Sequence, residues 1–389
     1  MGSGSDAPSR LEKYIGRRCA TDLHLMTHTL PHSPSTVEGA AESRYPADRL
    51  LEDVTKLFVH AGLAADKAGT VASTLLDADM MGHATHGLVL VPWYLEAIES
   101  GSLAHAGEIE VVSDRGACVA WNGHRLPGAW LIHRAIDLSL ERIAEHGVFT
   151  ITIAGAHHTG ALATYLPRLT SRGLMPILSC SGPASSGVAP FGGMRPLFTP
   201  NPLAAGIPTS QDPMLLDISS SITTNNRARQ LASEGRRFPG AWAIDAEGHA
   251  TDDPVAAVQD GGSLLPVGGL DHGHKGYGMA LLVEALTQGL SGLGRNSRPK
   301  GVVMNVFLQV IDPAAFGGTD AFVTETTWLA DACRDNPPRP GVRKVRVPGE
   351  QAMVLHRAAQ KHGVPLSAGT IAALADRLRA AGLPVPTPL

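Results

Sequence analysis

The hydrophobic pattern of this 389-residue chain changes twice along its length, and the two changes restrict its fold more than any other feature. Apolar residues first recur at helical spacing, as in Leu50, Val54, Leu57 and Phe58 after Pro46. Four apolar, β-branched runs follow, which predict strands within 147–155, 174–182, 214–220 and 302–312. Helical spacing returns after residue 325. The pattern predicts a mixed α/β fold with a helical unit at 45–110, an α/β domain at 111–324 and a further helical region at 325–389.

The boundaries of single elements follow from local signals. Gly62, Gly82 and Gly101 are expected to end three helices of the first unit. Helices are also expected at 129–146, 161–173, 276–290, 350–363 and 367–382, and a hairpin turn at Glu247-Gly248. Residues 1–44 have no sustained period and are rich in Ser, Thr, His and Pro, so we expect a disordered tail there.

Composition excludes several classes of protein. The net charge of −4 provides no general attraction to nucleic acid or to an anionic membrane. No stretch approaches the roughly 20 uninterrupted apolar residues that a membrane span requires, and the first residues lack a secretion signal. The four cysteines are far apart, which favours free thiols in a reducing cytoplasm over disulfides or a zinc knuckle: Cys19, Cys118, Cys180 and Cys333.

A turn rich in histidine follows the second helix. The stretch "GHATHG" places His83, Thr85 and His86 between two glycines. Imidazole titrates near neutral pH, so a histidine held in such a turn is a candidate proton donor or acceptor. The alternative is that these polar side chains bind the last carbonyl groups of the helix.

A second candidate site lies where a predicted strand enters His157-His158-Thr159-Gly160. Backbone N–H groups point outward at strand-to-helix junctions, so such a segment favours ligand contact. The alternative is a helix capped by Thr159. No H-E-x-x-H motif or helical histidine pair indicates a metal site.

Two further segments carry charged side chains at positions that suit a ligand. His274-Lys275-Gly276 opens an apolar helix, where the N-terminus and a lysine suit a phosphate or pyrophosphate, unless the lysine is only solvated. Neither a Walker loop nor a complete Rossmann fingerprint is present. Asp217 follows three apolar residues, and its carboxylate could orient a histidine, bind a cofactor hydroxyl or start a turn.

In their order along the chain, these segments resemble the malate/L-lactate dehydrogenase family of NAD(P)-dependent oxidoreductases, which has no Rossmann domain. Members reduce 2-keto acids, cyclic imino acids or ureidoglycolate-type substrates. The resemblance spans roughly residues 47–385 and rests on "GHATHG", "PWYLEAIESG", "HHTG", "VAPFGG", "NPLAAGIP", "LLDISSS", "WAIDAEGHATDDP", "LLPVGG", "HKGYGMALLVEALTQGLSG", "NVFLQVIDP" and "VPGE".

The resemblance implies a helical domain built from both chain ends, a mixed-sheet cofactor domain that binds NAD or NADP, and a homodimer acting on a small molecule. It implies that His86 lies beside the substrate and nicotinamide and that His158 acts as acid or base. The expected catalytic residues are His86, His158 and Asp217. Thr85, Leu90 and Tyr94 are then expected in the substrate pocket. The expected cofactor contacts are Thr159, Gly160, Ile218, Ser219, Ser220, Ser221, Lys275, Asn305, Pro348, Gly349 and Glu350.

The chain departs from the family pattern at several of these positions. Leu90 stands where the family usually has an arginine, and a leucine cannot hold a carboxylate by a charge-assisted fork. Thr85 replaces a serine, 199–202 read Thr-Pro-Asn-Pro instead of Gly-Thr-Asn-Pro, and Asn226-Arg227 replace Gly-Lys. We therefore expect a C=O/CH–OH oxidoreductase that handles simple 2-keto acids poorly. The alternatives are a cyclic imine reductase, or a relative without redox turnover that serves as a binding protein or a non-redox cyclase.

Overall fold

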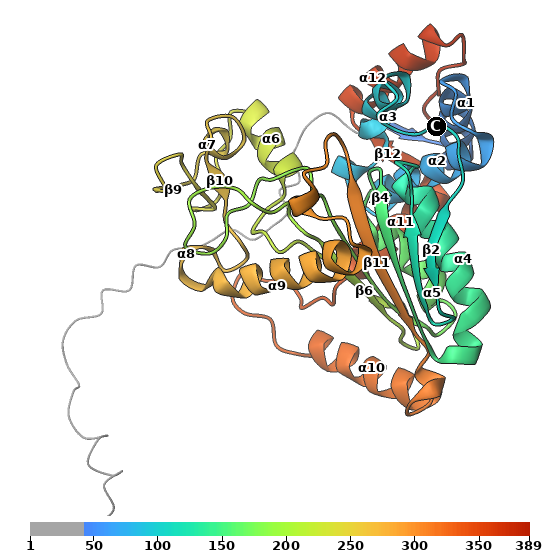
Figure 1. Cartoon of the computed structure of the whole chain (residues 1–389), viewed down its shortest axis with the longest axis vertical. Coiled ribbons are helices and arrows are strands. Elements are labelled where there is room, and N and C mark those ends of the chain that lie inside the picture. Colours follow the sequence, from blue (N-terminus) through green and yellow to red (C-terminus); the bar gives the residue numbers. More distant parts are fainter. Residues whose placement is uncertain (1–42) are drawn as a thin grey trace, which may run out of the picture. The chain divides into compact units, whose positions relative to one another are not determined.

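The computed structural model describes residues 43–389 (Figure 1). The tail prediction for residues 1–42, with Cys19, lies outside the described residues, but its last two positions are corrected. Ser43 and Arg44 belong to strand β1 (Ser43–Tyr45), which pairs antiparallel with β12 (Val364–Leu366) near the other end of the chain. This pairing joins segments more than 300 residues apart, so no local pattern could have indicated it.

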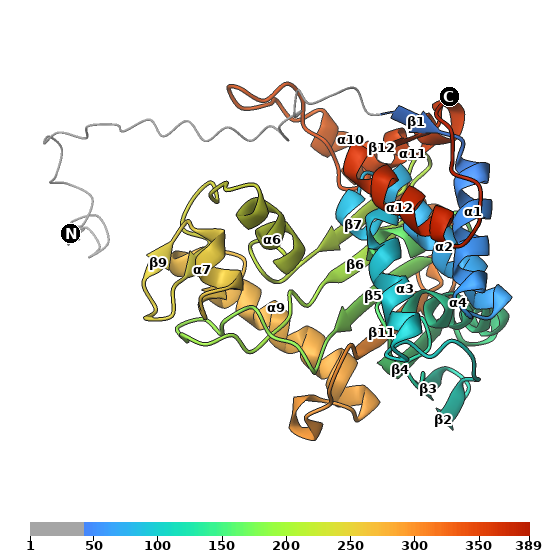
Figure 2. The ribbon, with the colours of Figure 1, turned by 90° about the horizontal axis from the view of Figure 1, so that it is seen from above.

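The centre of the protein is a seven-stranded sheet in the order β2-β3-β4-β11-β5-β6-β7 (Figure 2). Only β3 and β4 run parallel, and the other neighbouring strands are antiparallel. This arrangement differs from a Rossmann sheet, whose strands are parallel, and confirms the predicted mixed sheet. The strands are β2 (Glu110–Asp114), β3 (Cys118–Asn122), β4 (Val148–Ala156), β5 (Met175–Ser181), β6 (Leu203–Ile207), β7 (Met214–Ile218) and β11 (Met304–Ile311).

Two long helices pack against the middle of this sheet. Helix α4 (Gly128–His146) contacts β4 and β11, and its buried apolar residues share one core with both strands. Helix α9 (His274–Glu284) continues as a π-helical turn, Ala285–Gly289, that contacts β4, β5 and β11. These helices cover apolar side chains of the strands, as a sheet with two apolar faces requires.

A second core is built from both ends of the described chain. It contains residues of α1 (Ala47–His60), α2 (Ala65–Met80), α3 (Val91–Glu99), α11 (Glu350–His362) and α12 (Ala368–Ala380). Figures 1 and 2 show these blue and red segments side by side. Leu50, Val54, Leu57 and Phe58 are buried in it, which confirms the helical spacing of the first unit. By contrast, α10 (Thr319–Arg334) packs its Ala330 with Met214 of β7, outside this core.

A third, smaller core lies around α6 (Asn225–Ser233), α7 (Pro254–Val258) and the short sheet β10-β8-β9. Strands β8 (Ala243–Ile244) and β9 (Ala250–Thr251) pair antiparallel around Glu247-Gly248, so the predicted hairpin is confirmed. The remaining elements here are β10 (Ser263–Leu264) and α8 (Gly269–His272).

The helix predicted over 161–173 is wrong in extent. The segment forms only the 3-10 turn η4 (Leu162–Tyr165) and the single helical turn α5 (Pro167–Thr170). Pro167 explains the break, because proline cannot donate the backbone hydrogen bond that would continue a helix across it. No helix in residues 43–389 is long and apolar enough to cross a membrane.

Candidate active site

A pocket of about 690 Å³ opens beside the strand ends of the central sheet. Its volume lies in the range of small-molecule and cofactor sites. Three parts of the chain form most of its wall: the histidine turn with the start of α3, the segment after β4, and the start of α6 with the loop after β5. The lining residues are His83, Thr85, His86, Trp93, His158, Thr159, Gly160, Ala161, Leu162, Cys180, Ser185, Ser186, Thr199, Pro200, Pro202, Asp217, Ser219, Thr224, Asn225, Asn226, Arg229, Val302 and Met304.

The histidine turn is held by two glycines. Gly82 has a φ of +84° and ends α2, after which Ala84–His86 form a 3-10 turn. Gly87 is needed for a different reason, because a Cβ there would lie 2.2 Å from the Asp79 carboxylate. That carboxylate accepts a hydrogen bond from the Leu88 backbone N–H at 2.7 Å and ties the turn to α2. The "GHATHG" stretch is therefore a rigid turn at the pocket wall.

His86 and His158 lie together although 72 positions separate them. Their rings are nearly parallel, with centroids 6.2 Å apart and an interplanar angle of 12°. Burial lowers the pKa of His86 to about 4 and the pKa of His158 to about 3. Both imidazoles are therefore neutral at physiological pH. The Thr85 hydroxyl lies 3.0 Å from His86 Nδ1 and orients that ring.

Tyr94 orients His158 from behind the wall. Its hydroxyl shares its one proton between His158 Nδ1 at 3.0 Å and the His158 carbonyl oxygen at 3.3 Å, and the Gly160 backbone N–H donates to the same nitrogen at 3.4 Å. A backbone N–H can only donate, so Nδ1 is an acceptor and the neutral ring carries its proton on Nε2. Tyr94 is 1% exposed and does not line the pocket. It is a positioning residue, whereas the sequence analysis expected it in the substrate pocket.

Trp93 and His157 complete the aromatic surroundings of His158. The Trp93 ring centroid lies 5.4 Å from that of His158 and 5.2 Å from that of His157. His157 is fully buried, and neither of its ring nitrogens has a hydrogen-bond partner within residues 43–389. Burial lowers its pKa to about 4, so the group behind His158 is neutral. The sequence analysis did not single out Trp93, although its position next to Tyr94 on a predicted helix was the available signal.

Asp217 lines the pocket from the end of β7, but it bonds to neither histidine. One of its carboxylate oxygens accepts a hydrogen bond from the Ala163 backbone N–H at 2.9 Å. Desolvation by burial raises the pKa of this carboxyl, and backbone hydrogen bonds oppose the rise. The observed contact shows Asp217 holding the chain that follows His158.

The expected cofactor residues fall into three groups. Thr159, Gly160 and Ser219 line the pocket. Ser220 and Ser221 lie just behind it, where their hydroxyls donate to the carbonyls of Pro200 and Thr223. These hydroxyls hold the loop after β7 against the segment that contains Pro200.

Several expected cofactor contacts lie outside the pocket wall. Lys275 is exposed on the first turn of α9, and Ile218 is 45% exposed. The Asn305 amide is buried and bonds to Gly155 N and Leu293 O. The turn 348–350 packs on β7, where Pro348 O accepts from Leu215 N, and Glu350 pairs with Arg334 and Lys344. A cofactor role for these residues stays a prediction. The contacts described above join them to other parts of the protein.

Leu90 also lies outside the pocket wall. It is half-buried and packs against the helical core that contains α1, α3 and α12. Residues Leu88–Leu90 form a separate 3-10 turn before α3 begins at Val91, so Leu90 does not share a helical face with Tyr94 in the way that uniform helical spacing predicts. This geometry does not support the expectation that Leu90 lines the substrate pocket.

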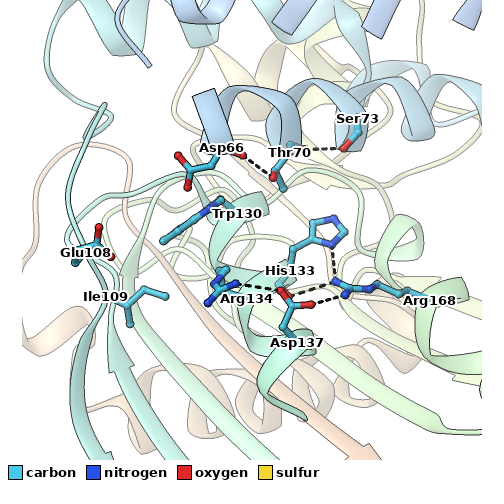
Figure 3. A pocket seen from close by; sticks show the side chains of 10 residues that line it. All are labelled: Asp66, Thr70, Ser73, Glu108, Ile109, Trp130, His133, Arg134, Asp137 and Arg168. Atoms are coloured by element: carbon cyan, nitrogen blue, oxygen red, sulfur yellow. Dashed lines mark hydrogen bonds and ion pairs between the residues drawn. The ribbon is translucent and has the colours of Figure 1, made fainter. Parts of the chain in front are cut away.

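A second hollow of about 690 Å³ lies between α2 and α4 (Figure 3). The charged side chains that line it pair with one another. Arg168 contacts both His133 Nδ1 and Asp137, and Asp137 also pairs with Arg134 at 3.5 Å. His133 accepts from Arg168 at Nδ1 and lies 3.5 Å from the Thr74 hydroxyl through Nε2. Both ring nitrogens of His133 thus have partners within this hollow, whereas His86 and His158 come together in the wall of the first pocket, which is the candidate active site.

The chain is similar to known proteins in sequence and in fold. The family model described as malate/L-lactate dehydrogenase matches residues 45–375, and the chain therefore belongs to this family of oxidoreductases. It is 33% identical over 295 residues to L-lactate dehydrogenase from Cupriavidus necator, covering 74% of this chain and 83% of the relative. It is 31% identical over 307 residues to (2R)-3-sulfolactate dehydrogenase (NADP(+)) from Chromohalobacter salexigens, covering 76% and 86%. The crystal structure of malate dehydrogenase from Entamoeba histolytica superposes with a TM-score of 0.83 at 21% identity, covering 89% and 100%, which shows the fold.

The pocket residues fit a nicotinamide cofactor. His83 Nε2 is buried at the wall and has no hydrogen-bond partner in the described part of the chain, as expected of a group that a bound ligand satisfies. Hydroxyl and amide groups of Ser185, Ser186, Asn225 and Asn226 line the far part of the pocket. Within residues 43–389, no cluster of three or more His, Cys, Asp or Glu side chains could hold a metal ion.

Proposed function

We propose that the protein transfers a hydride between NAD or NADP and a small substrate with a C=O/CH–OH pair. The observation that carries this proposal is the pair of neutral imidazoles, His86 and His158, stacked 6.2 Å apart in the wall of one pocket. Membership of a dehydrogenase family supports it. A relative named for NADP(+) supports a nicotinamide cofactor without deciding between NAD and NADP.

The two histidines would serve the proton transfer that accompanies hydride transfer. A nicotinamide cofactor supplies or takes the hydride when bound. In the direction of reduction, the His158 Nε2–H would donate a hydrogen bond to the substrate oxygen and stabilise the negative charge that develops there. His86, which lies beside His158, would carry the proton itself. Its protonated form gives the proton to this oxygen in reduction, and its neutral ring takes the hydroxyl proton back in oxidation.

The histidines are held so that this proton transfer needs little reorganisation. Tyr94 and Gly160 hold His158, Thr85 holds His86, and Asp217 anchors the chain after His158. Fixed groups contribute more to a transition state than groups that must first be oriented.

We further propose a homodimer that acts in the cytoplasm. Leu281 and Leu282 of α9, and Leu290 just after the π-helical turn, are 46%, 53% and 59% exposed. Exposed leucines of this kind support association with a second copy of the chain. Light scattering after gel filtration tests the proposal, and a monomer at micromolar concentration would contradict it.

Titration with NADH and NADPH, followed at 340 nm with a panel of substrates, tests the proposed activity. The panel should contain 2-keto acids, other ketones and cyclic imines. Pyruvate and oxaloacetate belong in it because Leu90 does not line the pocket. Turnover of a carbonyl substrate would support the proposal. Turnover of imines alone would favour a C=N reductase, and tight cofactor binding without any turnover would favour a binding protein.

A further inference from the structure

The charges of the pocket wall are sparse and unevenly placed. Among its lining residues, Arg229 is the only lysine or arginine and Asp217 is the only carboxylate. His86 and His158 are neutral. Any anion that the pocket binds therefore has one fixed positive charge available in the wall of this chain.

The Arg229 guanidinium is also uncommitted. It makes one hydrogen bond, from Nη1 to Asn226 Oδ1 at 3.3 Å, and within residues 43–389 it pairs with no carboxylate. Arg295, by contrast, binds Glu284 through Nε and Nη2 and Ser185 O through Nη1. A guanidinium has five N–H donors, so Arg229 retains most of its donors for a ligand.

The surroundings of Arg229 suit an oxygen-rich anion. The Ser185, Ser186, Asn225 and Asn226 side chains line the same part of the pocket and offer hydroxyl and amide groups. Arginine binds phosphate by parallel hydrogen bonds. Arg227, two residues earlier on α6, bonds to Gln230 Oε1 and does not line the pocket.

We propose that Arg229 anchors a phosphate group of the nicotinamide cofactor at the α6 end of the pocket, an inference that rests on the proposed function. A phosphate is favoured over a substrate carboxylate because of where Arg229 lies. In Figure 2, the ends of β5, β6 and β7 lie between α6 and α3, the helix that follows the histidine turn. The cation thus stands apart from the histidines that serve the reacting atoms, and a cofactor with a phosphate distant from its nicotinamide ring reaches both.

Arg229→Gln tests the proposal, because it removes the charge and keeps a polar side chain of similar reach. The dissociation constants of NADH and NADPH are measured by fluorescence titration, with Arg227→Gln as the matched control on the same helix. Arg229→Gln should weaken binding of at least one cofactor about five- to tenfold, a modest loss because the side chain is exposed. Arg227→Gln should change it less than twofold. Raising the salt concentration should weaken the wild type more than Arg229→Gln.

The substrate KM at saturating cofactor separates the two possible anions. An unchanged cofactor affinity with a raised substrate KM in Arg229→Gln would assign the arginine to a substrate carboxylate and overturn the proposal. Equal losses in both variants would reflect the general field of α6 and would also overturn it. A wild-type protein that binds neither NADH nor NADPH would refute the proposed function itself. Circular dichroism confirms that each variant is folded.

Discussion

Replacing Tyr94 by phenylalanine removes one atom from the support of His158. The hydroxyl oxygen that lies 3.0 Å from His158 Nδ1 is lost, and only the Gly160 N–H at 3.4 Å remains to donate to that nitrogen. The ring itself stays packed, since its contacts with Phe58 and Trp93, at centroid distances of 6.1 and 5.1 Å, do not involve the hydroxyl. The substitution therefore tests orientation with little change of shape.

The size of the effect follows from the burial of the bond. Tyr94 is 1% exposed, and a lost buried hydrogen bond of this kind costs about 1–2 kcal/mol in the free energy of unfolding. A similar loss of orientation in the transition state would lower kcat about tenfold. A hydroxyl that donates to Nδ1 favours the neutral ring, so its removal should raise the pKa of His158 from about 3. Burial, the main cause of the low pKa, is unchanged, so the value should stay below that of a free histidine.

Three measurements check this reasoning. Urea unfolding gives the stability, steady-state kinetics give kcat and KM, and the acidic limb of the kcat–pH profile should move to higher pH in Tyr94→Phe. Tyr45→Phe is the control, because Tyr45 is a buried tyrosine of β1 in the helical core, away from the pocket. A Tyr94→Phe protein with wild-type kcat and an unshifted acidic limb would show that Tyr94 only fills space and that the tautomer of His158 does not depend on it.

Four further predictions concern His158, His157, Gly87 and Leu90. His158→Asn should lower kcat about a hundredfold or more while changing cofactor affinity less than threefold; equal losses in both would assign His158 to binding. His157 should make the protein acid-sensitive: its folded pKa of about 4 lies below the unfolded value of about 6.5, so the unfolded state binds more protons. The contribution of His157 to the free energy of unfolding is then full above about pH 6.5 and falls by up to about 3 kcal/mol as the pH approaches 4. Urea unfolding at several pH values should show a smaller pH dependence in His157→Phe than in the wild type. Gly87→Ala should destabilise the fold by about 2–4 kcal/mol, because its Cβ would meet the Asp79 carboxylate at 2.2 Å; a wild-type melting temperature would show that the turn yields easily. Leu90→Arg should lower stability about 1–2 kcal/mol without creating keto-acid activity, since Leu90 packs on the helical core; a gain of pyruvate turnover would place this side chain at the substrate.

Local pattern was sufficient for much of the fold. The helical spacing of Leu50, Val54 and Leu57 predicted α1, and the apolar runs predicted β4, β5, β7 and β11, because these elements are determined by residues within a few positions of one another. Gly82 was also a local signal, because it marks the end of α2 and the start of the histidine turn. The 161–173 segment shows the limit of this reasoning, since its apolar spacing favoured a helix and Pro167 divided it.

The sequence by itself determined the family and the mixed sheet with helical ends, and it indicated His86 and His158 as candidate site residues. Only the tertiary structure decided what each side chain faces: it stacked His86 on His158, gave Asp217 the Ala163 N–H as a partner, and turned Leu90 toward the helical core. Lys275 lies at the predicted helix start yet outside the pocket, whereas Arg229, which no motif marked, lies in its wall. The physical reason is that a helix or strand is set by neighbours along the chain, whereas a pocket wall is assembled by long-range packing of segments that carry no sequence signal of one another.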